Sequence, residues 1–351
     1  MNLKDLNEIR EFFYENFKKS LNDSHVFFYF CSYIPVEIIY ASNYKPVRFI
    51  TDSIQFTHSD EVSPKYICPY LKSTIEFLIN NNLDRKNFIF TDGCDSSRRI
   101  YEIYKDLGFL NNSFYIKIPF NESESDINFL KIQFENLFKT INGNIDNEKL
   151  INSINLYNEG RKKLKSLIVN YKEASINIFY LNLLFHIMDI KEFLNLNPEF
   201  YKESKKEKEG SFYLLSTIFP LSFIEYLYSL RYEIYYDDSC FGYKNLELVK
   251  DYLKDPIYSL AKYYIKREGC ARRRVLEEKI DRIIQRFKEF SLDGVIVYNL
   301  KYCDPLIFYL PLIKEKLNRE KIPILIIEDD YSMNIKGQIR TRIEAFMEML
   351  K

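Results

Sequence analysis

The sequence has no net charge, few glycines and few histidines. Lysine and arginine together number 50, as do aspartate and glutamate, in a chain of 351 residues. Nucleic acids and anionic membranes bind clustered positive charge, so this balance argues against both as the main partner. With nine glycines there is little material for a glycine-rich phosphate loop, and neither G-x-G-x-x-G nor G-x-x-x-x-G-K-[ST] occurs. Dinucleotide binding and intrinsic ATP hydrolysis therefore lose support.

Other signatures are missing as well. H-E-x-x-H and G-x-S-x-G do not occur, which argues against zincin and α/β-hydrolase chemistry. His25, His58 and His186 are far apart in sequence, and we expect structural roles for them. The amino terminus lacks an apolar signal region, and the most apolar later stretch, 176–188, is shorter than the about 20 residues that span a bilayer. A cytoplasmic protein is expected, with its six cysteines as thiols.

The chain length favours two domains, because single hydrophobic cores stop growing beyond about 250 residues. In both halves, short apolar runs alternate with amphipathic helical stretches, which predicts an α/β fold with parallel sheets covered by helices. The expected strands span residues 25–30, 87–91, 113–118, 211–217, 232–236, 294–298 and 322–327. The expected organisation is an N-terminal α/β domain (1–145), a helical connecting region (146–209) and a C-terminal α/β domain (210–351).

The cysteines are distributed evenly, three in each half of the sequence. Cys31, Cys94, Cys240 and Cys303 each follow an expected strand directly or after a short turn. Ligands of open α/β sheets bind outside the carboxyl ends of the strands, so these four thiols are expected to converge. The remaining two, Cys68 and Cys270, lie in loops from which a ligand can reach a cluster.

Two alternatives to a shared site exist for these cysteines. Cysteine is often a small buried hydrophobic residue, but a buried filler has no reason to prefer turns such as DGCDSS, DDSCFG and YCDP. Structural zinc is disfavoured because the closely spaced C-x-x-C pairs typical of its sites are absent. Thiolates dispersed in the sequence but gathered in the fold are compatible with iron–sulfur ligation.

Seven segments carry a resemblance to a known superfamily. They are CSYIPVEIIYASNYKPVRF (31–49), CPYLKS (68–73), DGCDSSRRIYE (92–102), DDSCFGY (237–243), DGVIVYNLKYCDP (293–305), IPILIIEDDYS (322–332) and GQIRTRIEAFMEML (337–350). They resemble, in family order, the iron–sulfur proteins of the 2-hydroxyacyl-CoA dehydratase and benzoyl-CoA reductase superfamily. The resemblance implies two flavodoxin-like domains with an iron–sulfur cluster in the cleft between them.

The resemblance also implies the ligands. Dehydratase subunits of this superfamily hold a [4Fe-4S] cluster with three cysteines, whereas its double-cubane branch holds an [8Fe-9S] cluster with six. A cysteine occurs in every segment that looks like a ligand motif of that branch, so the double cubane is expected and [4Fe-4S] is the alternative. The implied ligands are Cys31, Cys68, Cys94, Cys240, Cys270 and Cys303. The nearby arginines that could offset cluster charge, with solvated surface residues as the alternative, are Arg98, Arg99, Arg272, Arg273 and Arg274.

The expected function is a low-potential reductase component that reduces a small-molecule substrate. In the family it resembles, a separate ATP-hydrolysing iron–sulfur activator injects the electrons. The alternatives are a 2-hydroxyacyl-CoA dehydratase subunit and a non-catalytic electron-transfer protein. A homodimer or a pair with a related subunit is expected. Ser32, Glu37 and Asp304 lie close in sequence to the implied ligands and are candidate proton donors, although each is also a common cap or turn residue.

Overall fold

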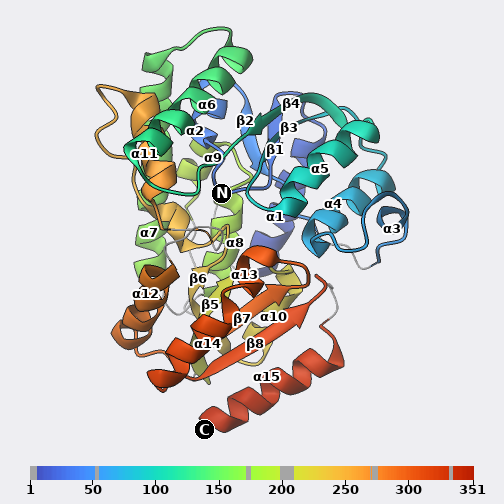
Figure 1. The fold of residues 1–351 in the computed structure, drawn as a ribbon, viewed down its shortest axis with the longest axis vertical. Helices are drawn as coiled ribbons and strands as arrows, with labels where there is room; N and C mark the ends of the chain where they lie inside the picture. The colour runs from blue at the N-terminus through green and yellow to red at the C-terminus, as the bar shows by residue number, and fades with distance from the viewer. Residues whose placement is uncertain are drawn as a thin grey trace. The chain divides into compact units, whose positions relative to one another are not determined.

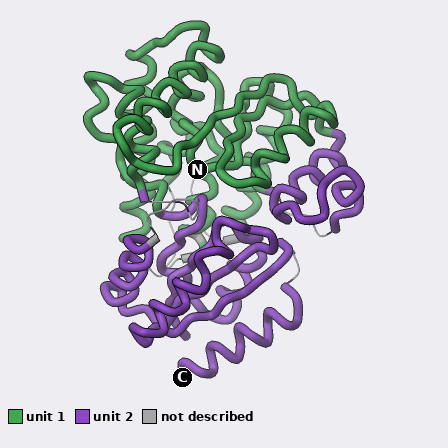
Figure 2. The backbone as a smooth tube through the Cα atoms, viewed as in Figure 1, with its two compact units in different colours: residues 1–50, 83–203, 244–267 green, residues 51–82, 204–243, 268–351 purple. Residues whose placement is uncertain are grey.

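The computed structural model describes residues 6–51, 55–170, 175–197, 209–268, 270, 276–331 and 335–351. The chain divides into two compact units, each assembled from separate stretches of sequence (Figure 2). Unit 1 comprises residues 1–50, 83–203 and 244–267, and unit 2 comprises residues 51–82, 204–243 and 268–351. The described strands form one four-stranded, wholly parallel sheet in each unit, which confirms the predicted α/β fold.

The sheet of unit 1 has the strand order β2-β1-β3-β4 (Figure 1). Its strands are β1 (Val26–Tyr29), β2 (Lys45–Arg48), β3 (Lys86–Thr91) and β4 (Leu110–Ile116). The central strands β1 and β3 are buried along nearly their whole length, as expected for parallel strands with both faces covered. Their core is aromatic: the rings of Phe30 and Phe88 stack with centroids 5.6 Å apart.

The helices of unit 1 pack mainly against one another and against this sheet. They are α1 (Leu6–Leu21), α2 (Val36–Ala41), α5 (Asp95–Asp106), α6 (Glu124–Asn142), α7 (Asn147–Asn170), α8 (Ser175–Phe185), α9 (Ile190–Asn195) and α11 (Pro256–Lys266). Helix α1 packs on α8, α2 on α7, and α6 on α11. Helix α6 begins at a capping box in which Ser123 and Asp126 each accept a backbone hydrogen bond from the other residue, which satisfies donors that the first helical turn leaves open.

Unit 2 repeats the arrangement with the strand order β6-β5-β7-β8. The strands are β5 (Gly210–Ser216), β6 (Tyr232–Asp238), β7 (Gly294–Leu300) and β8 (Ile324–Asp329). The described helices of this unit are α3 (His58–Val62), α4 (Pro69–Asn80), α10 (Leu221–Ser229), α12 (Leu276–Glu289), α13 (Asp304–Ile307), α14 (Leu310–Arg319) and α15 (Gly337–Leu350). A short 3-10 helix, Tyr243–Leu246, lies at the passage from unit 2 back into unit 1.

Both sheets have a topological switch point. It lies between two neighbouring strands whose next strands are added at opposite edges of the sheet. In unit 1 the switch point lies between β1 and β3, and in unit 2 it lies between β5 and β7. The carboxyl ends of such a strand pair form the crevice in which open α/β sheets bind ligands. The loops that follow these four strands are therefore where the fold places a site.

All seven predicted strands are present, with ends shifted by a few residues. The missed strand is β2, which contains Lys45, Pro46 and Arg48. Proline removes a ladder hydrogen bond and is tolerated at a sheet edge, and β2 is one of the two edge strands of its sheet. Strand β2 therefore lacks the apolar run that marks a central strand in the sequence.

The two units are not continuous in sequence, whereas the expected domains 1–145, 146–209 and 210–351 are. The helices expected at 146–209 are present as α7, α8 and α9, and they belong to unit 1 together with residues 244–267. The segment 51–82, which was expected in the first domain, packs with unit 2. The loop before α4 and α4 itself contact the rest of unit 2 through aromatic pairs, Tyr66 with Tyr302 and Tyr70 with Tyr331.

Candidate functional site: a cysteine group and an arginine pocket

Three cysteines of unit 2 form a group although they come from three separate segments. Cys68 is the N-cap of α4, Cys240 follows β6, and Cys303 follows β7 as the N-cap of α13. The charge of Cys240 acts on Cys68, and the charges of both Cys68 and Cys240 act on Cys303. By sequence Cys68 belongs to the first half of the chain, and the fold instead brings it to Cys240 and Cys303.

The protein surroundings favour the protonated form of the Cys68 thiol. Burial raises the pKa of Cys68 to about 11; backbone N–H groups of Tyr70 and Leu71 oppose the rise, and Cys240 adds to it. These two N–H groups belong to the first turn of α4, where the positive end of the helix dipole favours a thiolate. Thiols in such a place lose their protons when they bind a metal, since the metal supplies the compensating positive charge.

Cys303 is the most enclosed member of the group, with 7% of its surface exposed. Burial raises the pKa of its thiol to about 12, and the nearby Cys68 adds to the rise. The Thr217 hydroxyl lies 3.3 Å from the Cys303 sulfur. Because Thr217 follows β5 and Cys303 follows β7, this contact lies at the switch point of the second sheet.

Two further cysteines lie at the switch point of unit 1. Cys31 comes directly after β1, and Cys94 comes after β3 as the N-cap of α5, where its sulfur accepts a hydrogen bond of 3.3 Å from the Ser97 N–H. Gly93 brings the two loops together, because a methyl group on its Cα would lie 3.4 Å from the Cys31 sulfur. The strand-end placement predicted for Cys31 and Cys94 is thus observed.

The residue type fits an iron–sulfur cluster, because thiolates are the ligands of its iron atoms. All six cysteines lie among the described residues, and none forms a disulfide. Within the described ranges, no three cysteine, histidine, aspartate or glutamate side chains are close enough to surround one metal ion, as zinc would require with about 2.3 Å to each sulfur. Cys270 is half-buried in unit 2.

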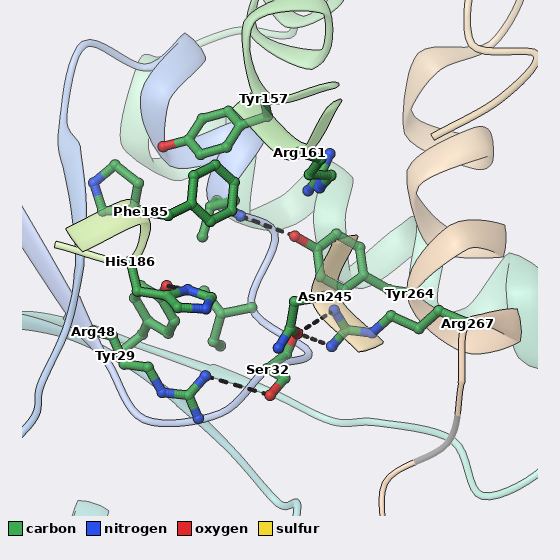
Figure 3. A pocket seen from close by; sticks show the side chains of 13 residues that line it. Tyr29, Ser32, Arg48, Tyr157, Arg161, Phe185, His186, Asn245, Tyr264 and Arg267 are labelled. Atoms are coloured by element: carbon green, nitrogen blue, oxygen red, sulfur yellow. Dashed lines mark hydrogen bonds between the residues drawn. The ribbon is translucent and has the colours of Figure 1, made fainter. Parts of the chain in front are cut away.

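A pocket lined by arginines lies within unit 1 (Figure 3). Arg48 at the end of β2, Arg161 on α7 and Arg267 after α11 all line it, and the three side chains are at least nine-tenths buried. Arg48 and Arg267 converge on Ser32, the residue after Cys31. Arg48 donates to its hydroxyl at 3.4 Å, and Arg267 donates to its carbonyl oxygen.

The other walls of the pocket are mixed. Tyr29 and His186 face each other across a hydrogen bond of 3.3 Å between the tyrosine hydroxyl and Nδ1. Burial raises the pKa of Tyr29 to about 12, with Arg48 opposing the rise. Apolar side chains complete the lining, among them Ile34 and Pro46. The arrangement offers positive charge, hydrogen-bonding groups and an apolar wall within one small volume.

Comparisons with known proteins extend over nearly the whole chain. A family model described as 2-hydroxyglutaryl-CoA dehydratase, D-component, matches residues 31–350. The chain belongs to this family. It is 27% identical to the (R)-phenyllactyl-CoA dehydratase beta subunit of Clostridium sporogenes, over 91% of this chain and 90% of the relative. It is 20% identical to a benzoyl-CoA reductase subunit of Thauera aromatica, over 91% of this chain and 89% of the relative.

A third relative of this dehydratase family is the lactoyl-CoA dehydratase subunit beta of Anaerotignum propionicum. It shares 22% identity with the chain, over 91% of this chain and 90% of the relative. These matches confirm the superfamily expected from the seven sequence segments. They also agree with the two parallel sheets, which are consistent with two flavodoxin-like domains. In the part of the chain that the structure describes, no helix is both long and apolar enough to cross a bilayer.

The three candidate proton donors lie in different surroundings within this family fold. Ser32 lines the arginine pocket. Glu37 on α2 is completely buried, where it accepts hydrogen bonds from Arg161 and, at 2.8 Å, from the Tyr264 hydroxyl. Asp304 is exposed in the first turn of α13, next to Cys303. Ser32 and Glu37 belong to unit 1, and Asp304 belongs to unit 2.

The arginines that the sequence favoured are not the ones that the fold buries. Arg98 and Arg99 are exposed on α5, and Arg99 pairs with Asp95 at 2.6 Å; Arg272, Arg273 and Arg274 lie outside the described residues. Sequence reasoning missed Arg48, Arg161 and Arg267. Arg267 could have been found from the sequence, because it lies three residues before Cys270, in the loop that the sequence analysis considered as a source of a cluster ligand.

Proposed function

We propose that this chain is an iron–sulfur reductase component of its family that holds an [8Fe-9S] double-cubane cluster and reduces a small substrate. The observation that carries the proposal is the gathering of Cys68, Cys240 and Cys303 in unit 2, with Cys31 and Cys94 paired at the matching switch point of unit 1. Three thiolates are what one cubane needs when its fourth iron is bridged or open. The chain offers more thiols at these positions than a single cubane uses.

The residues around the sulfurs would set the properties of the cluster. When bound, the cluster supplies electrons at low potential, the more so with many thiolate ligands. The N–H groups of Tyr70, Leu71 and Ser97 donate to cysteine sulfurs, and such donors raise the reduction potential of a cluster by stabilising its negative charge. Among the described residues, Arg267 is the buried cation whose charge interacts with Cys31.

The proposal includes a separate electron donor. No nucleotide-binding loop occurs in the sequence, so ATP-driven reduction of the cluster would be the task of another protein, an ATP-hydrolysing iron–sulfur activator. A homodimer, or a pair with a related subunit, would complete the enzyme. The relatives named as beta subunits of dehydratases support pairing with a second subunit.

A second candidate function is favoured by those same names. As a 2-hydroxyacyl-CoA dehydratase subunit, the chain would hold one [4Fe-4S] cluster with three cysteines and take part in the elimination of water from an acyl-CoA. The group of Cys68, Cys240 and Cys303 has the number of thiols that this cluster requires. Cys31, Cys94 and Cys270 would then have other roles.

Metal analysis of the full chain, purified without oxygen, separates the two candidates. About eight irons per chain are expected for the double cubane and about four for the dehydratase cluster; a chain without iron would disprove both. Cys303→Ser and Cys94→Ser should each lower the iron content and change the visible absorption if all six cysteines are ligands. If Cys94→Ser leaves both unchanged while Cys303→Ser lowers both, the single cubane in unit 2 is the better description.

A further inference from the structure

Two buried arginines hold the turn that carries Cys31, one on each side of it. Arg48 donates to the carbonyl oxygen of Phe30 at 2.7 Å, and Arg267 donates to the carbonyl oxygen of Ser32. The two arginines come from separate segments of unit 1, the end of β2 and the residue after α11. The backbone before and after Cys31 is therefore fixed by guanidinium groups that the fold brings in from elsewhere.

Arg267 has no carboxylate partner among the described residues, and it is 6% exposed. Its hydrogen bonds go to the Ser32 carbonyl and, at 3.1 Å, to the Asn245 side-chain oxygen (Figure 3). The rings of Tyr264 and Tyr33 lie against the guanidinium, with centroids 4.8 Å and 5.2 Å from Cζ. These neutral groups satisfy donors and exclude water, but they do not cancel the charge. A buried charge is normally paired, so a counter-charge for Arg267 is expected.

Cys31 can supply that counter-charge. Burial lowers the pKa of Arg267, but the charges around it, among them that of Cys31, raise the pKa overall. A cysteine that binds iron gives up its proton and stays a thiolate, and each electron added to an iron–sulfur site makes it more negative. A cation held one residue from such a ligand stabilises the reduced form more than the oxidised form.

We propose that Arg267 is the counter-cation of the iron–sulfur site: it holds the Cys31 turn through the Ser32 carbonyl and raises the reduction potential by favouring added negative charge. Arg267 is a positioning residue, because it acts through Cys31 and does not touch substrate. The inference rests on the proposed function, since it requires that Cys31 binds iron. It assigns to unit 1 a control over a potential that many thiolate ligands would otherwise lower.

Arg99 provides the contrast within the same unit. It lies five residues after Cys94, another implied ligand, but its side chain is 55% exposed and pairs with Asp95 at 2.6 Å. Water, salt and the carboxylate screen such a charge. Arg99→Gln is therefore the matched control for Arg267→Gln, because the two substitutions change the residue type and the net charge in the same way.

A redox titration of the full chain, purified without oxygen, tests the inference. The sample takes up electrons from an electrode through mediators, and visible absorption and electron paramagnetic resonance report the reduction. Arg267→Gln should make reduction about tenfold less favourable for each electron, which is a fall in potential of about 59 mV. Arg267→Lys keeps the charge without the planar fork and should recover most of this difference. Arg99→Gln should have the potential of the parent.

Asn245→Asp tests the charge while the arginine stays in place. The Asn245 side-chain oxygen already accepts a hydrogen bond from Arg267, so a carboxylate there keeps the acceptor and neutralises the guanidinium. This variant should lower the reduction potential in the same direction as Arg267→Gln. It supplies the measurement if Arg267→Gln does not fold or does not retain iron.

Three results would overturn the role of Arg267. These are a potential equal to that of the parent in either Arg267→Gln or Asn245→Asp, a fall of the same size in Arg99→Gln, and a fall in Arg267→Lys as large as that in Arg267→Gln. Iron content is measured on the same samples. Iron with a potential that does not depend on Arg267 disproves only this inference. About four irons per chain with that dependence disproves only the double cubane, and a parent without iron disproves the proposed function together with the inference.

Discussion

The cysteine group of unit 2 and the arginine pocket of unit 1 belong to units with similar parallel sheets, but they bury side chains of opposite electrostatic character. The cysteine group encloses Cys68 and Cys303, whose thiol pKa values are raised by burial, together with Cys240. The arginine pocket encloses permanent cations, of which Arg161 is balanced by Glu37. One site is positioned mainly by turns and helix starts of the backbone, the other by long side chains that reach in from separate segments.

This difference predicts which kind of substitution damages each site. A site positioned by the backbone is damaged by a change that blocks a turn, even where no charge is altered. A site held by buried charges is damaged by a change of charge that leaves the side-chain shape intact. Three predictions test this contrast, beginning with the largest expected effect.

Removal of the charge of Glu37 should cost the most stability. Glu37→Gln keeps the shape but leaves Arg161 buried without its carboxylate, which is expected to lower the free energy of unfolding by about 3–5 kcal/mol. Glu37 is fully buried and Arg161 is 3% exposed, so water cannot compensate. Urea unfolding followed by circular dichroism measures the change.

The double variant Glu37→Gln with Arg161→Met provides the control. Replacing both partners removes the buried charge altogether, so much of the lost stability should return. If the double variant is as unstable as the sum of its single variants, the pair acts by packing rather than by charge. The contrast with the cysteine group would then fail.

Gly242 tests the dependence of the cysteine group on the backbone. It lies two residues after Cys240, and a methyl group on its Cα would overlap the carbonyl oxygen of Asp237. Gly242→Ala therefore has to shift the turn that carries Cys240, at an expected cost of about 3 kcal/mol. Differential scanning calorimetry measures the change in Tm, and iron analysis measures the loss of metal.

Gly337→Ala is the matched control for this variant. Gly337 is the first residue of α15, and a methyl group there meets no atom within 4 Å among the described residues. Because alanine favours helices over glycine by about 1 kcal/mol, this variant should be as stable as the parent or slightly more so. Equal losses of stability and iron in both variants would show that the turn at Gly242 has no special role.

The sequence predicted the parts of the two sites that depend on local patterns. Buried strands are visible as apolar runs, and the positions of Cys31, Cys94 and Cys303 after those runs placed them at strand ends. The arginine pocket had no such signal. Arg48, Arg161 and Arg267 come from distant segments, and their convergence is a property of the packed fold. The place of Cys68 in unit 2 was equally hidden, because it depends on where the helices α3 and α4 pack.

Glu76 on α4 offers the test with the smallest expected effect. It connects the start of α3 by hydrogen bonds to α4, the helix that begins after Cys68. Its carboxylate accepts hydrogen bonds from the backbone N–H of Ser59 at 2.8 Å and from His58 at 3.0 Å through Nδ1. Burial alone would raise the pKa of Glu76, but these donors outweigh it and hold the pKa at about 2, below the ordinary 4.5. Glu76 thus stabilises the fold above about pH 4.5, and this contribution is lost as the pH falls towards 2.

Glu76→Gln should therefore lower the free energy of unfolding at pH 6 by on the order of 2 kcal/mol. The difference between the parent and the variant should shrink towards zero between pH 4.5 and pH 2, as the carboxylate of the parent becomes protonated. His58 and Lys72 are the other ionisable groups near Glu76. Urea unfolding at several pH values measures it. A difference in the free energy of unfolding that stays constant from pH 6 to pH 2 would contradict this prediction. The hydrogen bonds to α3 would then not depend on the charge of Glu76, and backbone geometry would position this segment, as it does the turn at Gly242.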